Sequence, residues 1–178
     1  MSEPMPEQEL PSFIRRTGLA NWNRYAAVNE EFVPMHMDDG AGQAFGFPGA
    51  IGMGNLQIAY IHNFLRDWMG DAGRIAKVAC EFRAPNLKDT VVTVQGIVTN
   101  IEESADARQA QVTFTVTGSG GPDESSVVLA RGSATVEHVP QKSAQEAPEP
   151  GPRAQATALD GTSESVITPG GCDPDVTS

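Results

Sequence analysis

The chain has 178 residues, which is enough for one domain with tails, and a formal net charge of −11. This charge excludes binding along a nucleic-acid backbone, because such binding needs a cluster of Lys and Arg. The N-terminus has no basic region followed by an apolar run, and no stretch of about 18 apolar residues occurs anywhere. The sequence therefore predicts a cytoplasmic protein that neither spans nor binds a membrane.

Polar segments lie at both ends of an apolar central region. Residues 1–10 are expected to form a flexible N-terminal tail, and residues 140–178 a disordered acidic tail rich in Pro, Gly, Ser and Thr. Such segments bury too little apolar area to offset the entropy lost on ordering. Residues 11–139 are therefore predicted to form the single folded domain.

The first half of this domain contains one predicted strand and two predicted helices. Ser12–Gly18 is a candidate strand, and Asn21–Val28 is a short helix candidate. A longer helix is predicted over Ala50–Trp68. Its apolar side chains occur around nearly the whole circumference, which indicates a helix buried on most sides.

After Gly73 the apolar pattern changes to a period of two, which is typical of half-buried strands. Four strands are predicted, over Ala76–Phe82, Thr90–Ile101, Ala110–Val116 and Ser126–Val139. One antiparallel sheet wrapped around the long helix satisfies this order, so the fold class is α+β. Because one sheet covers only one side of so apolar a helix, we also expect a second subunit.

The stretch EEFVPMHMDD, Glu30–Asp39, lies between the two predicted helices and contains His36. Loops held on a rigid scaffold often carry binding chemistry, and histidine titrates near neutral pH. Taken alone, however, Glu31 and His36 are more often a surface acid and a packed histidine than a catalytic pair.

Three segments together resemble the MaoC-like hydratase and dehydratase family, of the (R)-specific enoyl-CoA hydratase type. The segment EFVPMH, Glu31–His36, is similar to the family motif D-x-N-P-x-H, and IGM, Ile51–Met53, is similar to H-G-M. Phe82, Pro85 and Asp89 match a later strand-pair motif. The resemblance covers roughly residues 10 to 139. It implies the hot dog fold, an antiparallel sheet wrapped around a long central helix.

This resemblance implies a hydro-lyase that adds water to a 2-enoyl thioester, or removes it from a 3-hydroxyacyl thioester, with acyl-CoA as the substrate. Glu31 and His36 would hold the water, and Glu31 would take its proton. The backbone N–H of Gly52, at the start of the helix, would stabilise the thioester oxygen. The residues assigned to substrate binding are Met53, Phe47 and Pro34.

Two departures from the family motifs keep an alternative open. Glu31 replaces the aspartate and Val33 replaces the asparagine, while Ile51 stands where the family has a histidine. A misplacement of about 1 Å can cost roughly a hundredfold in rate. The alternative is a non-catalytic hot dog subunit of a heteromeric acyl-CoA hydratase. A hot dog acyl-CoA thioesterase is less favoured, because the first acid on the helix is Asp67, near its far end.

No cofactor is implied, and the scattered histidines and cysteines match no metal-ligand spacing. The expected partners are an acyl-CoA substrate and a second hot dog subunit, in a homodimer or a heteromer. Gly42, Gly46 and Gly49 are expected to make the loop before the helix small and flexible, which would permit a wide pocket for a bulky acyl group.

Overall fold

The computed structural model describes residues 4–103, 108–120 and 125–138. The chain divides into two units, residues 1–143 and 144–178, and every described residue lies in the first. The predicted disordered tail, residues 140–178, therefore lies outside the described residues.

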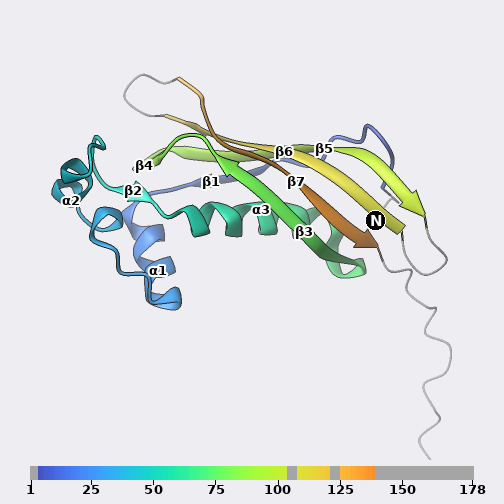
Figure 1. The fold of residues 1–178 in the computed structure, drawn as a ribbon, viewed down its shortest axis with the longest axis horizontal. Coiled ribbons are helices and arrows are strands. Elements are labelled where there is room, and N and C mark those ends of the chain that lie inside the picture. The colour runs from blue at the N-terminus through green and yellow to red at the C-terminus, as the bar shows by residue number, and fades with distance from the viewer. Residues whose placement is uncertain (1–3, 104–107, 121–124, 139–178) are drawn as a thin grey trace, which may run out of the picture. The chain divides into compact units, whose positions relative to one another are not determined.

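A five-stranded antiparallel sheet, in the order β1-β5-β6-β7-β3, covers one side of helix α3 (Figure 1). This arrangement confirms the predicted α+β class and the hot dog fold. It also confirms the N-terminal strand and the four strands predicted after the helix. The strands are β1 (Phe13–Arg16), β3 (Gly73–Phe82), β5 (Val91–Glu103), β6 (Arg108–Ser119) and β7 (Val127–His138), and α3 spans Gly54–Met69.

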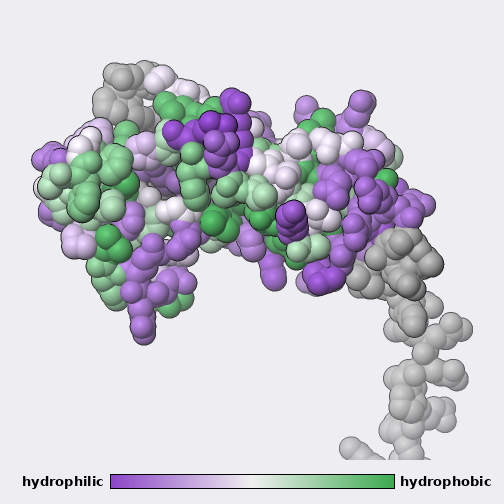
Figure 2. Space-filling view, viewed as in Figure 1, coloured by the Kyte–Doolittle hydropathy of each residue, from purple (hydrophilic) through white to green (hydrophobic). Residues whose placement is uncertain are grey.

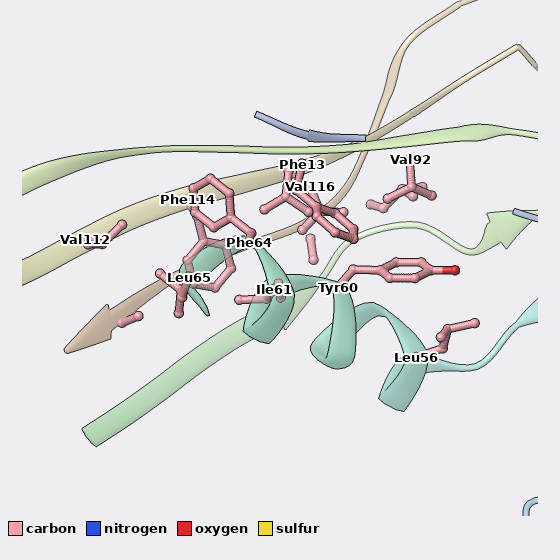
Figure 3. Close-up of a cluster of buried hydrophobic side chains, with 14 of the residues drawn as sticks. Phe13, Leu56, Tyr60, Ile61, Phe64, Leu65, Val92, Val112, Phe114 and Val116 are labelled. Carbon is pink, nitrogen blue, oxygen red and sulfur yellow. The ribbon is translucent and has the colours of Figure 1, made fainter. Parts of the chain in front are cut away.

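The core lies between the sheet and α3. Figure 3 shows Tyr60, Ile61 and Phe64 of α3 directed toward the sheet, with Phe64 beside Phe114 of β6. The rings of Phe13 and Tyr60 lie 5.9 Å apart between centroids. Alternate residues of β6 are buried against this helix face, which is why its period-two pattern was readable in the sequence.

The opposite face of α3 differs from the prediction. A helix buried on most sides was expected, but a polar face is exposed in the single chain, with Ile58 and Trp68 only half-buried beside it. Most of the apolar side chains of α3 are thus buried by this chain's own sheet. Burial of the helix alone therefore does not require a second subunit. The exposed polar residues are Asn55, His62, Asn63, Arg66 and Asp67.

The long helix begins later than predicted. Ile51–Gly52 form the short strand β2, which pairs with β4 (Asn86–Leu87), and Met53 keeps an extended backbone with φ −61° and ψ 139°. An extended pair of strands cannot be part of a helix, so α3 starts at Gly54 rather than near Ala50. A two-residue strand of this kind has no sequence period that could reveal it.

The N-terminal region also differs from the prediction. Residues 1–10 were expected to be a flexible tail, yet the backbone N–H groups of Glu7 and Leu10 donate to Val98 O (2.8 Å) and Gly96 O (2.9 Å) of β5. Leu10 is buried in the core. The chain is thus held to the edge of β5 from Glu7 onward, which extends the pairing beyond the four residues of β1.

Helix α1 (Leu19–Asn29) confirms the predicted short helix and buries Trp22 and Ala26. Between α1 and β2 the chain forms a 3₁₀ turn, η1 (Pro34–His36), and the short helix α2 (Asp39–Ala44). A second 3₁₀ turn, η2 (Gly70–Ala72), follows α3. The segment from α1 to β2 carries the predicted site residues.

Candidate active site

His36 ends η1, and its imidazole is largely buried, at 9% exposure. Its Nδ1 lies 2.7 Å from the backbone O of Ile51. Because a carbonyl oxygen can only accept, Nδ1 carries the proton and donates it in this bond. In the neutral ring this leaves Nε2 as the hydrogen-bond acceptor. The contact therefore fixes both the tautomer and the orientation of the ring.

Glu31 follows the end of α1, where Glu30 has the left-handed backbone conformation with φ 54°. The N–H of Glu31 donates to Ala26 O at 3.2 Å, and its side chain is half-exposed. The pKa of the Tyr25 hydroxyl is raised, first by burial and then by the negative charge of Glu31. Within the described residues, Glu31 and His36 share this loop without a direct hydrogen bond or ion pair.

Gly52 lies in β2 rather than at the start of the helix, where it was expected. The first-turn N–H groups of α3 therefore belong to residues from Gly54 onward, two positions further along the chain. A Cβ on Gly52 would lie 2.9 Å from Asn86 Nδ2 and 3.1 Å from the Trp22 ring, so a larger residue would displace its neighbours. Met53, which follows it, is fully buried.

A buried polar network lies against Gly52. Thr17 Oγ1 accepts a hydrogen bond from Trp22 Nε1 at 2.7 Å and a longer one from Asn86 Nδ2 at 3.5 Å. Asn86 Oδ1 accepts from Thr90 Oγ1 at 3.0 Å. Such networks rigidify their surroundings when their members are satisfied. The sequence analysis missed these residues, although a threonine and an asparagine at strand ends were a usable signal.

A cavity of about 500 Å³ adjoins this network through Thr17 and is also lined by Arg16, Leu19 and Lys88. Its lining includes neither Glu31 nor His36. Within the part of the chain that the structure describes, no group of three or more His, Cys, Asp or Glu side chains could hold a metal ion. None of the helices found there is long and apolar enough to cross a membrane.

The three predicted substrate-binding residues lie in different environments. Met53 is in the core, Phe47 is half-exposed and Pro34 is exposed. Phe32 and Phe45 are each 65% exposed, and Figure 2 shows apolar residues on the surface over α2. The site loop thus presents apolar side chains to its surroundings, which is common where a protein binds another molecule.

Two glycines of this loop allow close packing at its base. A Cβ on Gly42 would lie 2.1 Å from Gly49 O, so the backbone approaches closely there. At Gly46 the backbone has φ +86° and no atom lies within 4 Å of a Cβ built there. The loop is therefore closely packed at its base and open only at its tip.

Comparison with solved structures finds several similar folds. The (R)-hydratase from A. caviae involved in PHA biosynthesis is 23% identical with a TM-score of 0.66, covering 76% of this chain and 98% of that one. The ChsH1–ChsH2 complex from Mycobacterium tuberculosis is 14% identical with a TM-score of 0.65, and the match covers 75% of this chain and 98% of that one. R-hydratase PhaJ1 from Pseudomonas aeruginosa is 16% identical with a TM-score of 0.64, and the match covers 76% of this chain and 82% of that one.

The comparison with curated proteins returned no match. The family model described as "MaoC like domain" matches residues 5–119, which is more than half of the chain. This match begins two residues before Glu7, where the pairing with β5 starts, and ends at the last residue of β6. On this match and the fold, the chain belongs to the MaoC-like domain family of hot dog hydratases and dehydratases.

Proposed function

We propose that this protein is a hydro-lyase that adds water to a 2-enoyl thioester, or removes it from a 3-hydroxyacyl thioester, with acyl-CoA as the substrate. The observation that carries the proposal is the hydrogen bond from His36 Nδ1 to Ile51 O, which leaves Nε2 as an acceptor in the loop that also holds Glu31. The family supplies the class of reaction.

In this mechanism the Glu31 carboxylate and His36 Nε2 hold one water between them. Glu31 takes a proton as the water oxygen bonds to the β-carbon. The electron pair of the double bond is delocalised over the α-carbon and the thioester oxygen, and the proton that Glu31 has taken is returned to the α-carbon. Negative charge develops on the thioester oxygen in the transition state, and the N–H of Gly52 is the proposed donor to it. The nearby N-terminus of α3 adds a favourable dipole.

The acyl group is proposed to contact Phe47 and Pro34, whereas Met53, the third residue assigned to substrate binding, is fully buried in the single chain. Support comes from the exposed apolar side chains of the same loop, Phe32 and Phe45. Covering a water-exposed phenylalanine with an acyl chain or a partner surface lowers the free energy.

We also propose a second hot dog subunit, in a homodimer or a heteromer. Strand β3 has 10 residues and pairs only with β7 in the described sheet, so its other edge is open. Proteins normally cover so long an edge. The ChsH1–ChsH2 neighbour is a complex of two chains. Light scattering after gel filtration is expected to give about twice the chain mass of 18.9 kDa for a homodimer.

The test is the loss of enone absorbance from short, long and ring-containing 2-enoyl-CoA substrates. Glu31→Gln and His36→Ala are each expected to lower turnover by about 10²–10⁴-fold, the usual contribution of general acid–base catalysis. Glu30→Gln is a matched control at the adjacent exposed carboxylate, and His62→Ala is the control for a histidine on α3. Both controls should keep full turnover.

The second candidate is a non-catalytic subunit, which Glu31 and the exposed Val33 favour because both depart from the family motif. It predicts that the protein alone has no turnover. A complex with a catalytic hot dog chain would turn over, and Glu31→Gln in this protein would leave that turnover unchanged. A thioesterase would instead release free CoA thiol, which a thiol reagent detects in the same samples.

A further inference from the structure

The Asp39 carboxylate joins three segments that are distant in sequence. Its Oδ1 accepts the backbone N–H of Ala50 at 3.0 Å, and its Oδ2 lies 2.6 Å from Lys88 Nζ. Asp39 begins α2, Ala50 directly precedes β2, and Lys88 directly follows β4. We call these three residues the Asp39 clamp.

The clamp leads directly to the imidazole of His36. Ala50 is bonded covalently to Ile51, whose carbonyl oxygen accepts from His36 Nδ1 at 2.7 Å. Ile51 pairs across the ladder with Leu87, the neighbour of Lys88. Asp39 therefore contacts the neighbours of both Ile51 and Leu87, the two paired residues of which Ile51 accepts the hydrogen bond from His36.

Close packing supports this arrangement. A Cβ on Gly49 would lie 3.0 Å from Asp39 Oδ1, so a side chain there would press on the carboxylate. The Asp39 and Lys88 side chains are 48% and 35% exposed, so their ion pair adds little to global stability. The clamp should therefore act on local position rather than on the stability of the fold.

The charges of the clamp persist at neutral pH. The pKa of Asp39 is lowered, first by the hydrogen bond with Lys88 and next by that from Ala50 N–H. The pKa of Lys88 is raised, first by the same hydrogen bond. Both groups are therefore ionised at neutral pH.

We infer that Asp39, held by Lys88, is a positioning residue for the proposed hydration: it fixes the Ile51 carbonyl, so that His36 keeps Nδ1–H and presents Nε2 to the reacting water. The effect on rate rests on the proposed function. The effect on the His36 ring does not, because it follows from hydrogen bonds in the free protein.

A purely structural role for Asp39 is the alternative. Asp39 lies in the first turn of α2, where a negative charge is favourable for a helix. That role would predict altered helix stability with no specific change at the His36 ring, so the state of the ring separates the two roles.

The experiment uses three variants of the full chain. Asp39→Ala removes both contacts, Asp39→Asn keeps an acceptor for the Ala50 N–H, and Lys88→Met removes only the cation. The matched control is Arg83→Met, which breaks the exposed Arg83–Glu81 ion pair of 2.6 Å at the end of β3.

The primary measurement is the ¹⁵N chemical shifts of the His36 ring, which distinguish the Nδ1–H from the Nε2–H tautomer. Asp39→Ala should give a mixture of tautomers, Asp39→Asn should keep Nδ1–H, and Lys88→Met should fall between them. Arg83→Met should match the wild type. Unchanged shifts in Asp39→Ala would overturn the inference, whether or not the protein hydrates enoyl-CoA.

The second measurement is the separation of kcat from KM for enoyl-CoA hydration. Asp39→Ala should lower kcat by about tenfold to a hundredfold, as expected for a misplaced catalytic group, with KM within about twofold. Asp39→Asn should recover most of kcat. If Asp39→Ala fails to fold, a wild-type ring and wild-type kcat in Lys88→Met would overturn the inference. Absent turnover in the wild type would reject the proposed function while the ring shifts still test the clamp.

Discussion

The helix–sheet core and the site loop, Glu31–Gly52, are stabilised by different interactions. In the core, α3 and the inward residues of β5, β6 and β7 are buried together as one apolar cluster. The site loop instead relies on single hydrogen bonds, such as His36 to Ile51 and Asp39 to Ala50, and leaves Phe45 exposed. Apolar burial is spread over many residues, whereas a single bond depends on one atom pair. Mutations should therefore separate stability from chemistry.

The largest expected effect is on the core. Phe64→Ala removes a fully buried ring beneath the sheet and should lower the free energy of unfolding by about 3–5 kcal/mol. Urea denaturation measures this loss. Val28→Ala, at a residue 82% exposed, should stay within about 0.5 kcal/mol of the wild type. A specific loss of kcat in the folded Phe64→Ala protein would show that the core and the site loop are not separable.

The next effect is on the site loop alone. Glu31→Asp shortens the proposed base by one methylene in a loop whose backbone is set by the left-handed Glu30. We expect kcat/KM for enoyl-CoA hydration to fall by about tenfold to a hundredfold, with an unchanged urea midpoint. An increase in kcat/KM would mean that the loop suits an aspartate better, and that Glu31 reflects reduced catalysis.

The same substitution, Gly→Ala, at one glycine in the sheet and one in the site loop gives a sharper comparison of the two regions. A Cβ would lie 2.1 Å from Ala79 O at Gly132, in the sheet, and 2.1 Å from Gly49 O at Gly42, in the site loop. Overpacking costs about 1–3 kcal/mol. Gly132→Ala should lower the free energy of unfolding and leave kcat unchanged, whereas Gly42→Ala should lower kcat more than stability. Equal effects of the two on both quantities would contradict the distinction.

The smallest effect is on pH dependence. The pKa of Asp39 is lowered from its ordinary value of 3.8, so its contribution to stability is present above that pH and is lost as pH falls through the lowered value. The pKa of Lys88 is raised from 10.5, so its contribution is present below that pH and is lost as pH rises through the raised value. The melting-temperature difference between wild type and Lys88→Met should be flat between these limits and shrink beyond them. A change near pH 7 would point to another group.

The core was predictable because its elements have periods. The run of apolar residues that includes Leu56, Ile61 and Phe64 predicted α3, and alternation around Phe114 predicted β6. The exposed face of α3 was misjudged because Ile58 and Trp68 lie at its margin and made the helix look apolar all round. Whether a helix face is buried depends on what packs against it, and the spacing of apolar residues in the sequence does not show this.

The site was predictable only as residue types. The family motif gave Glu31, His36 and Gly52 as candidates, which remain proposals, but the acceptor for His36 could not be named, because Ile51 reaches it through a strand pair with β4. Lys88 meets Asp39 across 49 positions of sequence, and no local pattern records such a contact. Long-range contacts of this kind follow from the folded topology.

The open tip of the site loop has a consequence for protein engineering. Gly46 has open space around it, while Gly42 and Gly49 touch backbone to backbone below it. Residues inserted next to Gly46 would extend outward without separating the base of the loop. A peptide tag or a cysteine for a fluorescent dye could be placed there to report on substrate or subunit binding, while the positions of His36 and Gly52 are preserved.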